Sequence, residues 1–215
     1  GLQTATGLET SALSLTLAKR LPVAAGLGGG SADAGAMLRQ LVRLGTLTDG
    51  VAWTIAASLG GDVPAAYASQ ACRMQREGER ILPLAGLPDL PALLVNPKLA
   101  CPTGPVFRAY DETGKAGPLD PAPLPDFEHP PAMIEWLGAE TRNDLEPAAI
   151  GLVPEIGGVL DRLRTLPGCA LARMSGSGAT CFALFETRAR MISAAETLAS
   201  ARRDWWIVPT LLKGG

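Results

Sequence analysis

A glycine-rich run near the start of the chain has the residue types and spacing of a phosphate-binding loop. The run extends from Pro22 to Ala32 and holds glycines at positions 26, 28, 29 and 30. Glycine permits positive φ and lets the backbone approach a ligand closely. Apolar residues at helical spacing follow, and a helix starting near Ser31 would point unpaired N–H groups and the positive end of its dipole at the same place. The run therefore predicts an anion site.

The alternative interpretation of this run is a flexible turn between a strand and a helix. Apolar and polar residues alternate over positions 13–17, which predicts a strand before the glycines and favours a phosphate loop. Two common phosphate motifs do not match. No lysine follows the glycines, and Ser31 stands where the dinucleotide-binding pattern has its last glycine. The prediction is a phosphate loop of another kind.

Asp62 is the best candidate for acid–base chemistry. It follows two glycines that end a predicted helix over 48–59, and it precedes the apolar stretch Val63–Ala68. In apolar surroundings a carboxylate requires a partner, because burial of an unpaired charge is costly. One interpretation is a cap for the turn that follows. The other is a group that orients a hydroxyl, or accepts its proton, in phosphoryl transfer.

Three further segments carry polar side chains. Ser175–Thr180 offers backbone N–H groups and hydroxyls between two predicted strands, and it is equally well a hairpin or a ligand loop. Residues 143–146 precede Pro147 and a helical turn, where capping alone accounts for their acidic character. His129, the only histidine, lies in a proline-rich loop, so neither a metal site nor a Ser-His-Asp hydrolase is predicted.

Composition bounds the class of protein. The 215 residues are 47% hydrophobic, enough for one large domain or two small ones. The net charge of −2 gives no electrostatic footprint for nucleic acid or a membrane, so the predicted partner is a small molecule. The four cysteines form no C-x-x-C pair, and no apolar run reaches the roughly 18–20 residues that span a bilayer. These features predict a cytoplasmic protein with buried, reduced thiols.

Helices and strands alternate along the chain with short connections, which predicts an α+β fold of two layers. Three prolines within 82–91 predict a boundary between domains 1–84 and 85–215. The segment 111–131, rich in proline and acidic residues, is expected to be an exposed loop. In the second domain, strands are predicted at 92–95, 171–174, 181–185 and 205–208, and helices at 103–110, at 154–166 and through 192–199.

Three elements occur in an order that resembles the GHMP kinase family, named for galactokinase, homoserine kinase, mevalonate kinase and phosphomevalonate kinase. They are Pro22–Ala34, Gly60–Pro64 and Met174–Thr180. Within the family, Gly28–Asp33 and Arg142–Pro147 are similar to the branch that phosphorylates a cytidine diphosphate-linked methylerythritol for isoprenoid precursors. The resemblance runs from about Leu13 to the end. It implies an N-terminal domain like ribosomal protein S5 domain 2, incomplete at its start, and a ferredoxin-like C-terminal domain.

The resemblance also implies roles for individual residues. Asp62 would be the catalytic aspartate that acts on the 2-hydroxyl of the erythritol, and Ser31 would contribute to the Mg²⁺ shell. Gly176, Ser177 and Gly178 would close over the site from the second domain, and Phe107 would pack near the cytidine. The chain would act as a monomer or homodimer. The ATP phosphates would be held by Pro22, Val23, Ala24, Ala25, Gly26, Leu27, Gly28, Gly29, Gly30, Ser31 and Ala32.

The resemblance fails at the front of the chain. Members of the family begin with a segment carrying a lysine that partners the catalytic aspartate, and no such segment precedes Gly1. Lys19 lies on the predicted strand and is not an equivalent. Little or no kinase activity is therefore expected of the chain as printed. Two alternatives stay open: another GHMP kinase for a small alcohol such as homoserine or mevalonate, and a non-catalytic nucleotide-binding module.

Overall fold

The computed structural model describes residues 14–23, 25–76, 78, 80–114 and 123–214, which divide into two compact units. The first unit holds the described residues up to Arg20 together with Gly28–Ala85. The second holds Leu21–Leu27 together with Gly86–Gly215. The glycine-rich run therefore changes unit between Leu27 and Gly28. No helix in the described part of the chain is long and apolar enough to cross a membrane.

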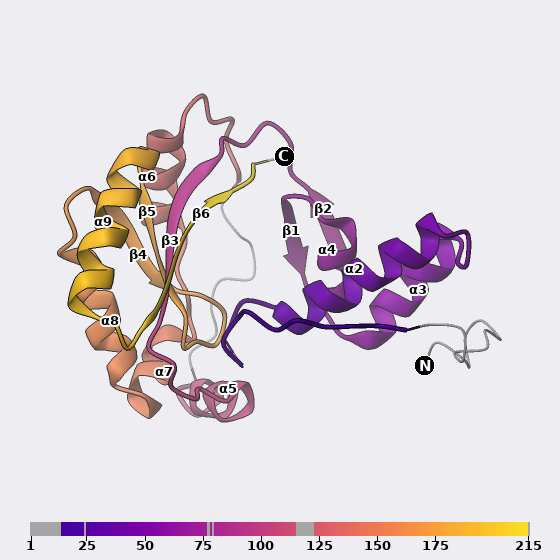
Figure 1. Ribbon diagram of the computed structural model, residues 1–215, viewed down its shortest axis with the longest axis horizontal. Coiled ribbons are helices and arrows are strands. Elements are labelled where there is room, and N and C mark those ends of the chain that lie inside the picture. Colours follow the sequence, from indigo (N-terminus) through magenta and orange to yellow (C-terminus); the bar gives the residue numbers. More distant parts are fainter. Residues whose placement is uncertain (1–13, 24, 77, 79, 115–122, 215) are drawn as a thin grey trace. The chain divides into compact units, whose positions relative to one another are not determined.

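The first unit is built from helices and a short hairpin (Figure 1). The elements are α2 (Gly29–Arg43), α3 (Asp49–Leu59), α4 (Asp62–Ala68), β1 (Cys72–Gln75) and β2 (Arg80–Pro83). Thr48 caps α3, since its side chain accepts a hydrogen bond from Val51 N, and Gly60 ends α3 at φ 148° as predicted. The apolar faces of the unit form one core of Leu38, Leu41, Leu47, Ala52, Ile55, Ala56, Val63 and Tyr67.

Helices α2 and α4 pack closely and run in the same direction. A Cβ atom on Gly35 would lie 2.7 Å from the carbonyl carbon of Ala66, so only glycine permits this approach. Further along α2, the Arg39 guanidinium donates to the carbonyls of Ala66 and Tyr67 at the end of α4. The N-termini of the two helices therefore lie at the same end of the unit.

The strand predicted over 13–17 is wrong in its described part. Residues 14–20 form no strand and are exposed, with Leu15 69% and Leu17 53% accessible. Alternation predicts a strand only where a neighbouring strand supplies hydrogen-bond partners, and none pairs with this segment among the described residues.

The second unit is an antiparallel sheet with helices on both faces. Its strands are β3 (Leu90–Asn96), β4 (Cys169–Met174), β5 (Cys181–Phe185) and β6 (Trp206–Leu212), in the order β4-β5-β3-β6. Its helices are α5 (Thr103–Asp111), α6 (Pro130–Glu140), α7 (Glu146–Leu152), α8 (Glu155–Arg164) and α9 (Arg188–Ala201). This βαββαβ order is that of the ferredoxin-like fold. The predicted α+β class is confirmed.

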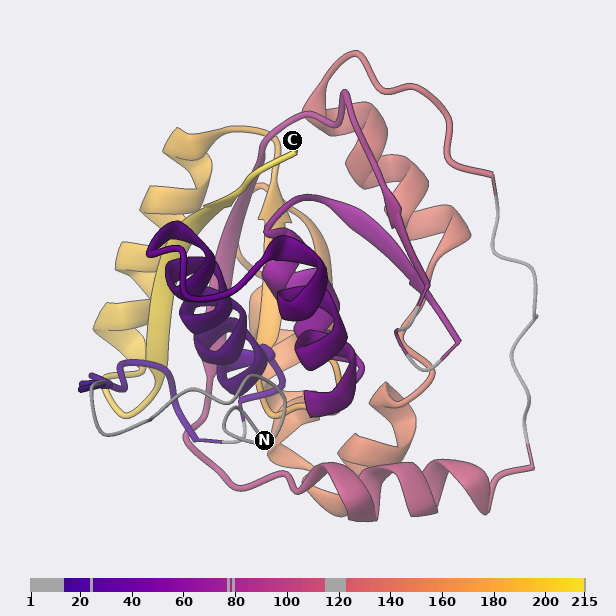
Figure 2. The ribbon, with the colours of Figure 1, turned by 90° about the vertical axis from the view of Figure 1, so that its right-hand side faces the viewer.

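Alternate residues of the strands face opposite layers. Leu93 of β3 and Phe185 of β5 point into the large core that α8 and α9 cover. Ala92 and Leu184 point the other way, into a smaller core with Ile134 of α6. Figure 2 shows α6 and α9 on opposite sides of the strands.

Two predictions in the second unit need correction. The exposed loop expected over 111–131 is too long, because α5 ends at Asp111 and α6 begins at Pro130. Prolines at the first positions of a helix replace N–H groups that have no helical acceptor, so they start α6 rather than exclude it. The helix predicted through 192–199 forms as α9 but begins earlier, at Arg188, and its buried face is Met191, Ala194, Ala195 and Leu198, with Ile192 40% exposed.

Candidate functional site

In the first unit, the packing of α2 against α4 brings the end of the glycine-rich run to Asp62. Gly28 precedes α2 at φ 61°, and a Cβ atom on it would lie 3.9 Å from Asp62 Oδ2. Gly61, which precedes α4, packs against Gly78 between β1 and β2. A Cβ atom on Gly78 would overlap the carbonyl of Gly61. The last part of the predicted phosphate loop, from Gly28 on, and the predicted catalytic carboxylate are thus neighbours within one unit.

The start of α2 offers unpaired backbone donors. Its first helical hydrogen bond is donated by Ala32 N to Gly28 O, at 2.8 Å. The N–H groups of Gly29, Gly30 and Ser31 come before it and have no acceptor in the helix. The first turn carries no acidic side chain that would repel an anion. Ser31, near which the helix was predicted to start, lies inside this first turn. The helix begins two residues earlier, at Gly29, after Gly28 in the left-handed conformation.

Asp62 is placed differently from the sequence expectation. It is the first residue of α4 rather than a residue before a turn, and no side-chain cap is formed there. It is also exposed, so the argument from an apolar neighbourhood was wrong. Within the described part of the chain, no hydrogen bond or ion pair engages its carboxylate. An exposed and unengaged carboxylate needs no structural partner and can face a substrate.

In the second unit, the first half of the glycine-rich run lies against the Ser175–Thr180 loop. Ser175 Oγ donates to Gly26 O at 2.8 Å, and Thr180 N donates to Ala25 O at 3.3 Å. Gly26 has φ 67°, and a Cβ atom there would lie 2.5 Å from Ser175 O. Pro22, Val23 and Leu27 are described in the same stretch, whereas Ala24 lies outside the described residues. Two loops distant in sequence are thus joined.

The Ser177 side chain is turned inward. It is 7% exposed, and its hydroxyl shares a 2.9 Å hydrogen bond with Thr103 Oγ1 at the start of α5. Cys101 Sγ donates to the Ser177 carbonyl at 3.2 Å, and burial raises the pKa of this thiol. Phe107, one turn further along α5, is 47% exposed. The Ser177 hydroxyl therefore ties the loop to the helix that carries Phe107.

Two residues that hold this loop were missed by sequence reasoning, which assigned only capping to their segment. Asn143 Nδ2 donates to Met174 O at 2.9 Å and to Gly176 O at 2.8 Å. Glu146 Oε2 accepts from Met174 N at 2.9 Å. Met174 belongs to the edge strand β4, so its N–H would otherwise find no strand partner. The signal in the sequence that could have indicated Asn143 and Glu146 was the similarity of Arg142–Pro147 to one branch of the family.

Replacement of Glu146 tests this support. Glu146→Ala removes the acceptor for the N–H of buried Met174, and we expect it to lower the free energy of unfolding by about 1–3 kcal/mol. Glu146→Gln keeps an oxygen in place and loses only a 3.9 Å ion pair with half-exposed Arg164, so about 1 kcal/mol or less is expected. Urea unfolding followed by circular dichroism measures both variants, and equal losses would contradict the hydrogen-bond role.

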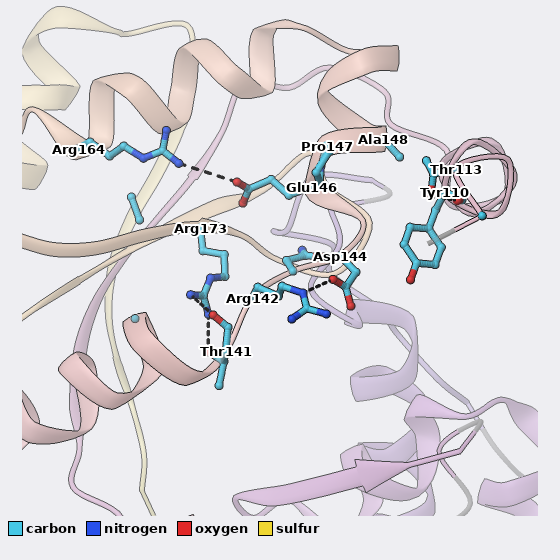
Figure 3. A pocket seen from close by; sticks show the side chains of 14 residues that line it. Tyr110, Thr113, Thr141, Arg142, Asp144, Glu146, Pro147, Ala148, Arg164 and Arg173 are labelled. Carbon is cyan, nitrogen blue, oxygen red and sulfur yellow. Dashed lines mark hydrogen bonds and ion pairs between the residues drawn. The ribbon is translucent and has the colours of Figure 1, made fainter. Parts of the chain in front are cut away.

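An open cavity of about 920 Å³ lies beside the same segment. Figure 3 shows Arg142 facing Asp144, Glu146 pointing toward Arg164, and Arg173 turned to Thr141. Arg173 donates to Thr141 Oγ1 and to the carbonyls of Leu137 and Thr141. Among the described residues, those that line the cavity include none of the predicted site residues.

The described residues contain no group of three His, Cys, Asp or Glu side chains placed to hold a metal ion by themselves. The four cysteines are free thiols, of which Cys101 and Cys181 are buried and Cys72 and Cys169 are partly exposed. The prediction of buried thiols thus holds for two of them. Burial raises the pKa of Cys181 to about 12, so this thiol stays protonated.

Comparison with known proteins matches both parts of the chain. The model of the GHMP kinases N terminal domain matches residues 2–70, and that of the GHMP kinases C terminal matches residues 126–203. A protein of Hyphomonas neptunium named 4-diphosphocytidyl-2-C-methyl-D-erythritol kinase is 51% identical over 98% of this chain and 71% of its own length. A protein of the same name from Dinoroseobacter shibae is 48% identical over 93% of this chain and 68% of its own length.

A solved structure is similar as well. The crystal structure of a 4-(cytidine 5'-diphospho)-2C-methyl-D-erythritol kinase aligns with a TM-score of 0.69 and 36% identity, over 91% of this chain and 69% of that one. A homoserine kinase from Cytophaga hutchinsonii aligns with a TM-score of 0.57 at 16% identity, which concerns the fold alone.

Proposed function

Because this chain belongs to the GHMP kinase family, we propose that it transfers the γ-phosphoryl group of ATP to the 2-hydroxyl of 4-diphosphocytidyl-2-C-methyl-D-erythritol. The choice of substrate is supported by relatives that are 43–51% identical to this chain and are named 4-diphosphocytidyl-2-C-methyl-D-erythritol kinase. The observation that carries the proposed chemistry is the exposed carboxylate of Asp62 beside Gly28, at the N-terminus of α2.

The glycine-rich run fits a nucleotide polyphosphate. The donors of Gly29, Gly30 and Ser31 face no competing acceptor in α2, and a Cβ atom on Gly30 would meet nothing within 4 Å. We assign the ATP phosphates to residues 22–32, and the domain 1–84 to nucleotide binding. The Ser31 hydroxyl, together with the phosphates, would hold Mg²⁺, which would supply neutralisation of phosphate charge. Mg²⁺ usually keeps several waters and binds substrate phosphates, so it requires few protein ligands.

Asp62 serves the acceptor alcohol. Its carboxylate orients the 2-hydroxyl and accepts the hydroxyl proton as the oxygen bonds to the γ-phosphorus and the bond to ADP breaks. Phosphoryl transfer requires mainly positioning and charge stabilisation, and one carboxylate and a backbone cradle contribute to both. The absence of a described partner for Asp62 leaves its lone pairs available for this proton.

The second domain, 85–215, holds the substrate. We assign substrate contacts to Gly176, Ser177 and Gly178 and to the exposed ring of Phe107, which is suited to stacking on a cytosine. The inward Ser177 hydroxyl means that this residue contributes backbone groups rather than its side chain. The hydrogen bond between Ser177 and Thr103 fixes the position of the loop relative to α5.

A coupled assay of ADP formation tests the proposal. It uses the chain as printed and, in parallel, a fused chain that adds the part of the Hyphomonas neptunium relative that this chain does not cover. We expect turnover with 4-diphosphocytidyl-2-C-methyl-D-erythritol in the fused chain. Homoserine and mevalonate serve as competing alcohols. Turnover of either in preference to the cytidine compound would reject the substrate, and nucleotide binding without turnover of any alcohol would favour the non-catalytic module.

A further inference from the structure

The Asn143 side chain makes three described hydrogen bonds, and each has a separate consequence. Its Oδ1 accepts from Leu145 N at 3.0 Å, which shapes the turn before α7. Its Nδ2 donates to Met174 O and to Gly176 O, on the two sides of Ser175. One half-buried amide therefore fixes the backbone where β4 ends and the Ser175–Thr180 loop begins.

The contacts continue from this loop to the glycine-rich run. Ser175, held between the two carbonyls that Asn143 binds, donates through Oγ to Gly26 O at 2.8 Å. A Cβ atom on Gly176 would lie 3.0 Å from the same Gly26 oxygen, so the two backbones are in direct contact. Thr180 N adds a bond to Ala25 O. A shift of the Ser175–Gly178 turn would therefore shift residues 25 and 26.

We infer that Asn143 is a positioning residue: it holds the Ser175–Gly178 turn, and through Ser175 it holds Ala25 and Gly26 in the conformation that binds nucleotide phosphates. This role rests on the proposed function, because it assigns ATP phosphates to the glycine-rich run. Asn143 itself touches no reacting atom. Its effect passes through hydrogen bonds that lie wholly within the second unit.

Asn143→Asp separates this role from the capping role of the same side chain. The aspartate keeps an oxygen for Leu145 N but places a carboxylate oxygen against the carbonyls of Met174 and Gly176, where the amide had donated. Asn143→Ala removes the donors without adding charge. Asp144→Asn is the matched control, since Asp144 is exposed and, among the described residues, pairs only with neighbouring Arg142. All three variants are made in the chain as printed.

Hydrogen exchange is the first measurement. The amides of Ser175, Gly178 and Thr180 donate to Thr180 O, Ser175 O and Ala25 O, and exchange reports these bonds directly. We expect exchange of the peptide 175–180 to speed up by about tenfold in Asn143→Asp and Asn143→Ala, while that of β5 stays unchanged. A merely structural role would speed exchange in β5 and α7 equally.

Binding of ADP, measured by titration calorimetry, is the second measurement. We expect about tenfold weaker binding in both Asn143 variants and wild-type affinity in Asp144→Asn. Unchanged exchange at 175–180 would overturn the inference, and so would faster exchange with unchanged ADP affinity. If the wild-type chain binds no ADP, the proposed function is wrong, and Asn143 cannot position a phosphate site. The exchange data then still decide separately whether Asn143 holds the Ser175–Gly178 turn.

Discussion

Replacement of Asp62 by asparagine should lower kcat of the fused chain by about 10²–10⁴-fold while nucleotide binding survives. Asparagine has the shape of aspartate but cannot accept the proton of the 2-hydroxyl. The fold should tolerate the change, because the carboxylate is exposed and forms no described hydrogen bond or ion pair. Loss of a negative charge beside Gly28 should leave the affinity for ADP unchanged or slightly higher.

Asp49→Asn is the matched control for this experiment. Asp49 is the first residue of α3, as Asp62 is of α4, so both substitutions remove a charge from the first turn of a helix. The asparagine still offers an oxygen to the Tyr67 hydroxyl, which donates to Asp49 at 2.5 Å. Burial raises the pKa of Tyr67 to about 12, so this donor stays protonated throughout the assay range. Wild-type turnover in Asp62→Asn, or an equal loss in Asp49→Asn, would exclude Asp62 as the base.

Much of the second unit could be predicted from local patterns. The apolar runs Ala92–Val95 and Cys181–Phe185 mark buried strands, and both form as expected. The sheet order could not be derived this way, since it depends on pairings between residues about 90 apart, such as Ala92 with Leu184. Helix α6 was missed because its first residues are prolines within a proline-rich segment.

In the candidate site too, local patterns predict single elements, whereas the contacts between distant residues could not be predicted. The spacing of glycines predicts an anion loop, and the structure places its second half at a helix N-terminus as required. That Gly28 neighbours Asp62 was beyond sequence reasoning, because it depends on the close approach of Gly35 to Ala66. The contact of Gly26 with Ser175 joins residues 149 apart. The segment at Asn143 was interpreted as capping alone, because its amide binds the carbonyls of Met174 at the end of β4 and of Gly176 in the next loop, and no local pattern encodes that.

Replacement of Gly26 by alanine should weaken ADP binding by about 30-fold or more. Gly26 has φ 67°, which costs an L residue about 1–2 kcal/mol. The new Cβ atom would lie 2.5 Å from Ser175 O and 2.6 Å from Gly178 O, and both are backbone atoms that cannot rotate away. Overpacking of this kind costs a further 1–3 kcal/mol, so the combined penalty exceeds the roughly 2 kcal/mol that corresponds to 30-fold.

The penalty should be relieved locally rather than by unfolding. Residues 21–27 are a short segment of the second unit, tied to the Ser175–Thr180 loop by the bonds to Ala25 and Gly26. Detaching this segment costs less than disrupting the sheet beneath, so ADP affinity should fall far more than the melting temperature. Gly45→Ala is the control, because Gly45 has φ 69° but a Cβ atom there meets nothing within 4 Å. It should lose about 1–2 kcal/mol of stability and keep its affinity for ADP. Equal ADP binding by Gly26→Ala and wild type would mean that nucleotide phosphates do not depend on this contact.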